Sequence, residues 1–289
     1  MPVRSQRCPA CGAALTGRPA RMPPGYVRCT GCSLGHLEIL PEAPAAAARF
    51  GPRYFAGEEA GHYPAYGADE PVHRHNAQRV LGRVEPVRSP GARLLDVGCG
   101  YGFLLDEARR AGWTVGGVDV SAHAREEARA RFGIEVAGDL DSLPDDADGF
   151  AAVTAVQVLH HAVDPDAQLN DIAERMRPGG LLALETLDRG AAIARVLGPR
   201  WSLPAAPWTV WLFDRPSLTR MLGRCGFSVL DIRVSHKRIS LRHLSGAMEA
   251  RRESSHDGWK SAALGRLGRL AVPYPFTDTI LVTARRRAA

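Results

Sequence analysis

The stretch LLDVGCGYGFLL, residues 94–105, places glycine at every second position, at Gly98, Gly100 and Gly102. Because glycine has no Cβ, such a loop can turn tightly and let a ligand approach its backbone. A dinucleotide site instead has the pattern G-x-G-x-x-G, and the position of its last glycine is Phe103 here. Asp96 precedes the loop, and its charge would repel a pyrophosphate but suit an ammonium group. The loop therefore indicates a cationic ligand rather than a dinucleotide.

Two further acids follow the next two apolar segments. Asp119 ends GGVDV, where a carboxylate can accept from both hydroxyls of a ribose or, alternatively, favour the N-terminus of a helix. Asp139, in AGDLDSLP, can accept from an adenine amino group, and Leu140 offers a backbone N–H and an apolar wall. One ligand, S-adenosylmethionine, carries an ammonium, a ribose and an adenine. The candidate cofactor-binding residues are Asp96, Gly98, Gly100, Tyr101, Gly102, Asp119, Val120, Asp139, Leu140 and Gln157.

Four of the six cysteines form two C-x2-C pairs near the start of the chain, Cys8, Cys11, Cys29 and Cys32. Two residues between thiolates let a tight turn direct both sulfurs to one ion, so the spacing predicts a tetrahedral structural zinc site. Two disulfides are the alternative, which a reducing compartment disfavours. His36 is an alternative fourth ligand. A site closed by four ligands would support folding rather than catalysis.

Short apolar strands alternate with helical patterns from residue 91 onward, which is typical of a parallel sheet with crossover helices. Ser121 and Asp164 are the expected N-caps of two helices. Two more helices are predicted at 103–111 and 215–225, and an amphipathic one within 258–275. Strands are predicted at 93–97, 114–120, 134–137, 150–157, 181–187, 226–234 and 278–285.

The motifs LLDVGCGYG, GVDVSAHA, AGDLDSLP, QVLHHAVDP and RPGGLLALET resemble those of class I S-adenosylmethionine-dependent methyltransferases. The segments CPACG, CTGCSLGHLEILPE and YFAGE are similar to a zinc-ribbon subgroup. That subgroup includes sugar C-methyltransferases and methyltransferases of polysaccharide or secondary-metabolite pathways. The resemblance implies an α/β fold: a small zinc ribbon before a Rossmann-like, seven-stranded, mostly parallel sheet with helices on both faces. Its last strand would lie antiparallel between the fifth and sixth.

The resemblance also divides the chain. Residues 1–40 would form the ribbon, 41–90 a linker and helical lid, and 91–289 the methyltransferase domain. Acceptor-site insertions are expected at about 188–214 and 236–275.

Two departures from the subgroup bear on the acceptor. The chain ends before the further C-terminal domain of the sugar enzymes, and the tetrapeptide P-E-H-L of relatives is replaced here by Pro207, Trp208, Thr209 and Val210. The loss of a polar position favours an apolar or aromatic acceptor over a sugar.

Methyl transfer to a hydroxyl requires loss of its proton, so a general base is useful. His160 and His161 follow the fourth predicted strand, and the resemblance places them beside the methyl group. The family often has Glu-His here, so His161 is the candidate base and His160 stands in the place of the glutamate. A purely structural hydrogen bond is the alternative role for His161. Gln157 is expected to contact the methionine part of the cofactor.

Aromatic and histidine side chains gather in two further segments. The first should close over the site and contains Tyr54, His62, Tyr63, Tyr66, His73 and His75. The second follows the fifth strand, where acceptor pockets are usually built, and contains Trp201, Trp208, Trp211 and Phe213. For both segments, ordinary core packing is the alternative.

The composition is that of a soluble globular protein, with 45% hydrophobic and 24% charged residues. No secretory signal or membrane-spanning run is evident, so a cytoplasmic protein is predicted. The net charge of +6 is uneven, because residues 93–188 carry 8 basic and 18 acidic side chains, whereas residues 189–289 carry 18 and 6. The sequence thus predicts an O-methyltransferase for a small acceptor, aromatic or glycosylated, in a secondary-metabolite or glycoconjugate pathway. An RNA methyltransferase, a non-catalytic S-adenosylmethionine-binding protein and a dehydrogenase are the alternatives, and nucleic-acid contact is not expected.

Overall fold

The structure is a computed structural model of the chain. It describes residues 7–18, 21–42, 48–58, 66–144, 148–201, 208–243, 268 and 270–288. Within these ranges, no helix has both the length and the apolar character needed to cross a membrane.

A six-stranded sheet forms the centre of the described fold, in the order β5-β4-β6-β7-β12-β9. The strands are β4 (Arg93–Val97), β5 (Thr114–Val118), β6 (Phe150–Val156), β7 (Met176–Leu187), β9 (Phe227–Val234) and β12 (Thr279–Arg286). The first four are parallel, and β12 lies antiparallel between β7 and β9. The prediction of a Rossmann-like sheet with an inserted antiparallel last strand is confirmed.

The prediction of a seventh strand at 134–137 is wrong. Only Ala137 joins the sheet, through a parallel bridge to Val118. Its N–H donates to the Gly117 carbonyl and its carbonyl accepts from Asp119 N–H. In this register residues 134–136 would lie opposite 115–117 of β5 but do not pair with them, and Ile134 instead packs with Cys99 and Leu105.

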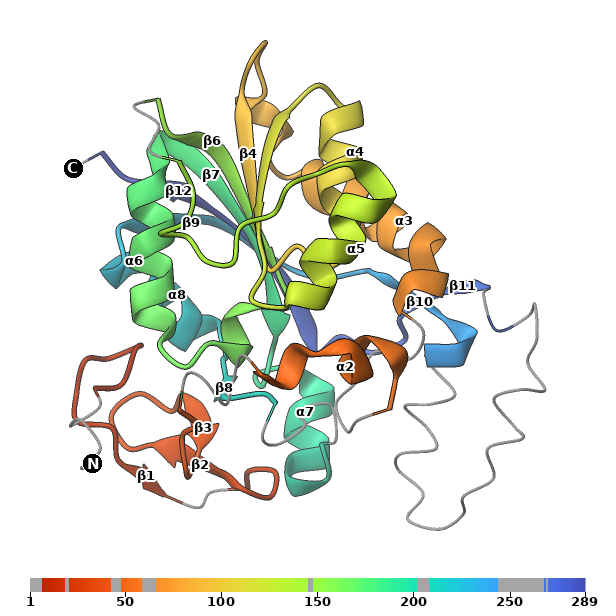
Figure 1. The fold of residues 1–289 in the computed structure, drawn as a ribbon. Coiled ribbons are helices and arrows are strands. Elements are labelled where there is room, and N and C mark those ends of the chain that lie inside the picture. Colours follow the sequence, from red (N-terminus) through yellow and green to blue (C-terminus); the bar gives the residue numbers. More distant parts are fainter. Residues whose placement is uncertain are drawn as a thin grey trace.

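Alternating side chains of the strands reach the two faces of the sheet, as the period of a strand requires. Leu94 packs with α3 (Glu70–Leu81) and α4 (Phe103–Arg110), whereas Leu95 packs with the opposite core. That core includes α6 (Pro165–Arg175) and α8 (Arg215–Arg224) (Figure 1). The expected helices on both faces are therefore present.

Local capping explains where the helices begin. Ser121 Oγ accepts from Ala124 N–H at the start of α5 (Ala122–Phe132), and Asp164 accepts from Ala167 N–H before α6. Asp214 and Ser217 form a capping box at the start of α8. Helix α3 belongs to this packed core rather than to a separate lid, because Arg74 pairs with Asp106 at 2.8 Å and with the neighbouring Glu107 of α4.

A second, antiparallel sheet has the order β1-β2-β3-β8. Its strands are β1 (Gly17–Arg18), β2 (Tyr26–Cys29), β3 (Gly35–Leu37) and β8 (Trp211–Leu212). The fourth strand therefore comes from the expected acceptor insertion and not from the first 40 residues. Tyr26 Oη also donates to the Thr209 carbonyl at 2.6 Å. The N-terminal sheet and residues 208–214 are one packed unit.

The remaining elements are short. They are η1 (Ala48–Phe50), α2 (Pro52–Ala56), η2 (Tyr66–Asp69), η3 (Glu85–Val87), η4 (Leu159–His161), α7 (Ala192–Leu197), η5 (Gly198–Arg200), β10 (Arg238–Ser240) and β11 (Ala271–Pro273). Strand β11 pairs with β10, so the end of the helix expected within 258–275 is a strand, and residues 258–267 lie outside the described ranges.

Candidate cofactor site and cysteine cluster

The glycine loop connects the end of β4 to the start of α4. Gly98 and Gly100 have φ angles of 69° and 54°, in the left-handed region that favours glycine. A Cβ added at Gly98 would lie 2.3 Å from Val158 Cγ2, and one added at Gly100 would lie 2.6 Å from Tyr66 Oη. Both backbone angle and space therefore require glycine here.

Asp119 and Asp96 lie beneath this loop. Asp119 Oδ2 accepts from Gly100 N–H at 2.8 Å and its Oδ1 accepts from Ser121 N–H at 2.9 Å, which ties the loop to the end of β5. Asp96 accepts from Thr154 Oγ1 at 2.6 Å. Burial raises the pKa of Asp96 to about 7, with a further rise from the charge of Asp119. Two buried acids that oppose each other's ionisation make a site that a cation would stabilise.

The residues expected around an adenine follow at the same sheet edge. Val120 is 55% exposed although it is apolar, whereas Leu140 is 9% exposed. Asp139 is exposed, and its Oδ1 accepts from the N–H and the hydroxyl of Ser142, which lower the pKa of Asp139. The bridge at Ala137 brings this loop next to the end of β5.

Aromatic side chains cover the glycine loop. Tyr101 stacks on Phe55 of α2 with ring centroids 4.9 Å apart, and its Oη lies 2.9 Å from His123 Nε2. The side chain of Tyr101 is therefore held by packing. Tyr54 lies beside it in α2, and burial, with the charge of Asp119, raises the pKa of Tyr54 to about 12. In Figure 1, α2 lies directly below α5.

The other residues of the expected lid have different positions. His73 stacks on Phe103 at 5.2 Å and contacts Tyr66, and burial lowers the pKa of His73 to about 3. His75 is exposed on α3. His62 and Tyr63 lie outside the described residues.

His160 and His161 form η4 at the end of β6, but their surroundings differ. His160 is 2% exposed and its Nδ1 lies 3.0 Å from Thr186 Oγ1 in β7. His161 Nδ1 lies 2.7 Å from the Trp208 carbonyl, which can only accept, so Nδ1 carries the proton. The lone pair is then on Nε2. Burial lowers the pKa of His161 to about 4, so this ring is neutral at pH 7.

Rings from three segments surround His161. Phe50 of η1 lies 5.5 Å from the His161 ring and 6.1 Å from Trp208, and Tyr54 lies 5.8 Å from Trp208. Of the aromatic residues expected at an acceptor pocket, Trp201, Trp211 and Phe213 are no more than 3% exposed, so they pack in the core. Trp208 is the member of that group whose carbonyl contacts His161 and whose ring contacts Phe50 and Tyr54.

Sequence analysis missed the group that holds Gln157. Gln157 has a φ of 59°, its N–H donates to the Glu185 carbonyl, and its Nε2 donates to Glu185 Oε1 at 2.9 Å. Glu185 is 1% exposed in β7 and also interacts with Arg79, Ser235 and Lys237. These partners outweigh burial and lower the pKa of Glu185. A lone glutamate in an apolar strand is the one sequence signal for this network.

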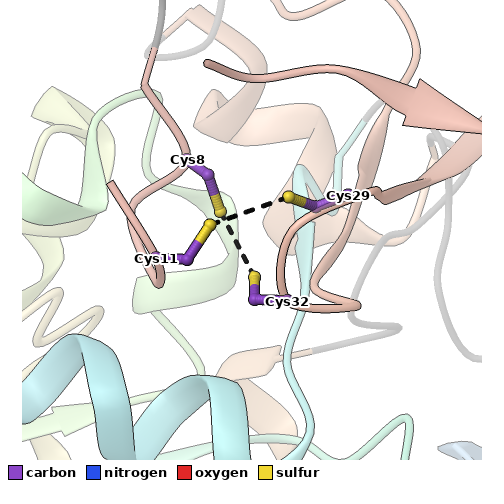
Figure 2. Close-up of side chains that lie close together, drawn as sticks. All are labelled: Cys8, Cys11, Cys29 and Cys32. Carbon is purple, nitrogen blue, oxygen red and sulfur yellow. Dashed lines mark hydrogen bonds between the residues drawn. The ribbon is translucent and has the colours of Figure 1, made fainter. Parts of the chain in front are cut away.

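The four cysteines of the N-terminal unit converge, as Figure 2 shows. Their sulfur atoms all lie within 4.8 Å of one another, and the Cys8–Cys32 and Cys11–Cys29 pairs are 3.5 and 4.0 Å apart. These separations exceed a disulfide bond of about 2 Å. Tetrahedral coordination with Zn–S bonds of about 2.3 Å would place the sulfurs about 3.8 Å apart. The donor set and its spacing fit zinc.

His36 is not part of that cluster. Its Nδ1 lies 2.8 Å from the Leu37 carbonyl and its ring packs 6.0 Å from Trp211. Among the residues that the structure describes, the group within ligand distance consists of cysteines alone. The alternative of a histidine ligand is therefore not supported.

Comparison with known proteins gives the family. A family model described as a methyltransferase domain matches residues 70–232, more than half of the chain. The ubiquinone biosynthesis O-methyltransferase of Xanthomonas axonopodis pv. citri is 36% identical over 140 residues, which are 45% of this chain and 57% of that protein. The protein of that name from Coxiella burnetii is 30% identical over 184 residues, 59% of this chain and 78% of that protein. The chain thus matches little more than half the length of the Xanthomonas relative.

Solved structures agree on the fold. A Bacillus halodurans structure named as a methyltransferase has a TM-score of 0.55 at 16% identity and covers 74% of this chain and all of that one. The [4+2]-cyclase SpnF has a TM-score of 0.51 at 22% identity and covers 75% and 81%. The chain belongs to the family of methyltransferase domains and has the class I, S-adenosylmethionine-dependent fold.

Proposed function

We propose that this protein transfers a methyl group from S-adenosylmethionine to a hydroxyl oxygen of a small aromatic molecule. The observation that carries the proposal is the tautomer of His161. Its Nδ1 donates to the Trp208 carbonyl, so the lone pair on Nε2 is available to a hydroxyl proton. The names of the relatives, O-methyltransferases of ubiquinone biosynthesis, support oxygen as the acceptor atom.

The residues around the glycine loop fit S-adenosylmethionine. The positive φ angles of Gly98 and Gly100 form a loop without side chains at these positions, whose backbone a ligand can approach. Asp119 would hold the ribose hydroxyls, Val120 would cover the adenine, and the negative field of Asp96 would favour the cationic methionine part. Gln157, anchored on Glu185, would orient that part. When bound, S-adenosylmethionine supplies a methyl group on a positively charged sulfur.

The chain's own contribution to the reaction is positioning and proton transfer. His161 would accept the hydroxyl proton at Nε2 while the Trp208 carbonyl holds the ring through Nδ1. Phe50, Tyr54 and Trp208 would form apolar walls that orient an aromatic acceptor and exclude water. His160 is buried against Thr186, which suits a positioning role rather than that of a second base.

The names of the relatives support the type of reaction more than they support a particular metabolic pathway. The relatives' names concern ubiquinone biosynthesis and do not support the secondary-metabolite or glycoconjugate pathway expected from sequence. A phenolic hydroxyl is the acceptor group that agrees with both those names and the aromatic walls.

We also propose that the four cysteines bind one structural zinc ion. Burial raises the pKa of Cys8, a penalty on its thiolate that a bound cation would offset. All four ligand positions would be filled by sulfur, which leaves no place for a substrate.

The test is a methylation assay with methyl-labelled S-adenosylmethionine and a panel of catechol, 3,4-dihydroxybenzoate and a phenyl glycoside. An O-methyl product identified by NMR is expected. His161→Gln should lower kcat by about 100-fold or more, as for loss of a general base. S-adenosylhomocysteine should bind this variant with unchanged affinity. The matched control is His236→Gln, an exposed histidine outside the site. A methyl group found only on nitrogen or carbon, or an equal kcat in both variants, would contradict the proposal.

A further inference from the structure

A cleft in the described residues lies away from the glycine loop, between the N-terminal sheet, α7 and the start of α8. Its volume is about 640 Å³, which is in the range of small-molecule sites. Five arginines line it, together with two aspartates, Asp188 and Asp214. The arginines are Arg21, Arg28, Arg189, Arg195 and Arg215.

The positive charge of this cleft is only partly compensated. Asp188 pairs with Arg215 at 3.2 Å, and Asp214 pairs with Arg189. The other three arginines of the cleft have no ion pair within the described part of the chain. The cleft therefore carries a surplus of three positive charges, which an anion would neutralise.

Two of its guanidinium groups also have unused donors. Arg28 Nε and Arg189 Nε are buried, and in the part of the chain that the structure describes neither has a hydrogen-bond partner. Both side chains are anchored on Ser33: Arg28 donates to its hydroxyl, and Arg189 donates to its carbonyl at 2.9 Å. A buried donor without a partner is costly, and both of these donors belong to arginines that line the cleft.

The position of the cleft relates it to the acceptor side of the fold. Asp188 lies two residues beyond Thr186, which contacts His160. Residues 208–214 run from the carbonyl that holds His161 to the cleft residue Asp214. Six residues span at most about 22 Å, which bounds how far an extended acceptor would have to reach. Met22, Pro23 and Pro216 supply apolar wall beside the charges.

We propose that this cleft binds the phosphate or diphosphate group of a small molecule. A planar guanidinium can donate two parallel hydrogen bonds to a phosphate, and several arginines can surround a diphosphate. A concave site with partly buried arginines suits a small anion better than a nucleic-acid backbone, which needs an extended basic surface. This inference stands on the cleft itself and does not require the methyl-transfer proposal.

The experiment is isothermal titration calorimetry of the full chain with inorganic pyrophosphate, against sodium chloride of matched ionic strength. Saturable binding of one pyrophosphate is expected, with at least tenfold weaker binding to Arg195→Gln and Arg28→Gln. Arg195 is exposed on α7, so its variant tests the site without risk to the packing on Ser33. The matched control, Arg220→Gln, removes an exposed arginine of α8 outside the cleft and should bind like the unmodified protein.

Four outcomes would overturn the proposal. Pyrophosphate could fail to bind, or bind Arg195→Gln and Arg220→Gln equally. It could also compete with S-adenosylhomocysteine, which would put the anion at the glycine loop instead. An RNA oligonucleotide that binds more tightly than pyrophosphate, and depends on Arg195, would assign the cleft to nucleic acid. Intact S-adenosylhomocysteine binding in any of these cases leaves the methyl-transfer proposal standing.

Discussion

The glycine loop and the arginine-lined cleft belong to the same edge of the central sheet, but opposite charges line them. Strands β4 and β7 are both parallel to β6, so the loop after β4 and Asp188 after β7 follow the same ends of their strands. The first site has the buried carboxylates Asp96 and Asp119 under an aromatic cover. The second has five arginines around an open cleft. In our account, the first binds a cationic cofactor and the second an anionic group.

The two regions also differ in their connection to the cysteine-bearing N-terminal segment. Arg21 and Arg28 come from the cysteine-bearing segment, and Ser33, which anchors Arg28 and Arg189, directly follows Cys32. The residues of the glycine loop have no such link to the cysteines among the hydrogen bonds of the described chain. Loss of the cysteine cluster should therefore affect one site and spare the other.

The largest expected effect comes from Cys29→Ser. We predict loss of stoichiometric zinc, measured by elemental analysis, and loss of detectable pyrophosphate binding. S-adenosylhomocysteine affinity should remain within about threefold, because the aromatic cover of the glycine loop packs in a separate cluster that contains no cysteine. Full pyrophosphate affinity in the zinc-free variant would show that the cleft does not depend on the cysteine cluster.

Asp119→Ala should have the next largest effect, on the glycine loop alone. Removal of the carboxylate leaves Gly100 N–H and Ser121 N–H without their acceptor and takes away the ribose contact. We expect S-adenosylhomocysteine to bind about 100-fold more weakly, as for loss of two charge-assisted hydrogen bonds. Pyrophosphate affinity should not change. Calorimetry with both ligands measures this, and an equal loss for both would indicate general unfolding.

Asp96→Asn should change the pH dependence of stability. Burial raises the pKa of Asp96 from 3.8 to about 7, so the folded protein binds more protons than the unfolded chain between these values. This contribution to stability is therefore present below pH 3.8 and is lost as the pH rises towards 7, by about 4 kcal/mol at most. The amide cannot ionise and can still accept from Thr154. Denaturant unfolding between pH 4 and pH 7 should show a flatter profile for the variant, and parallel profiles would disprove the assignment.

Tyr66→Phe should have the smallest effect. Its Oη lies 2.6 Å from the position that a Cβ at Gly100 would take, so the hydroxyl covers the loop but does not build it. We expect S-adenosylhomocysteine affinity to change by less than about threefold. A loss comparable to that of Asp119→Ala would make this hydroxyl a main cofactor contact.

The parts of the fold predicted from sequence are those that local chemistry determines. Strand 93–97 and the helix starts after Ser121 and Asp164 agree with the structure, because short apolar runs and N-caps act within a few positions. The glycine loop and its two acids likewise come from short motifs.

Features that depend on distant pairing could not be predicted. Strand β8 joins β3 through Gly35 and Leu212, and neither local segment encodes that choice of partner. The cleft has the same origin, since Arg28 and Arg195 are unremarkable surface-type residues until the fold brings them together. Glu185 was missed because its partners lie on α3, directly after β6 and directly after β9.

The most direct test of the central claim is native mass spectrometry of the full chain with equimolar S-adenosylhomocysteine and NAD. The acids below the glycine loop predict a complex with one S-adenosylhomocysteine and no NAD. Retention of NAD without S-adenosylhomocysteine would contradict the claim, because a loop over two buried carboxylates would then be holding a pyrophosphate.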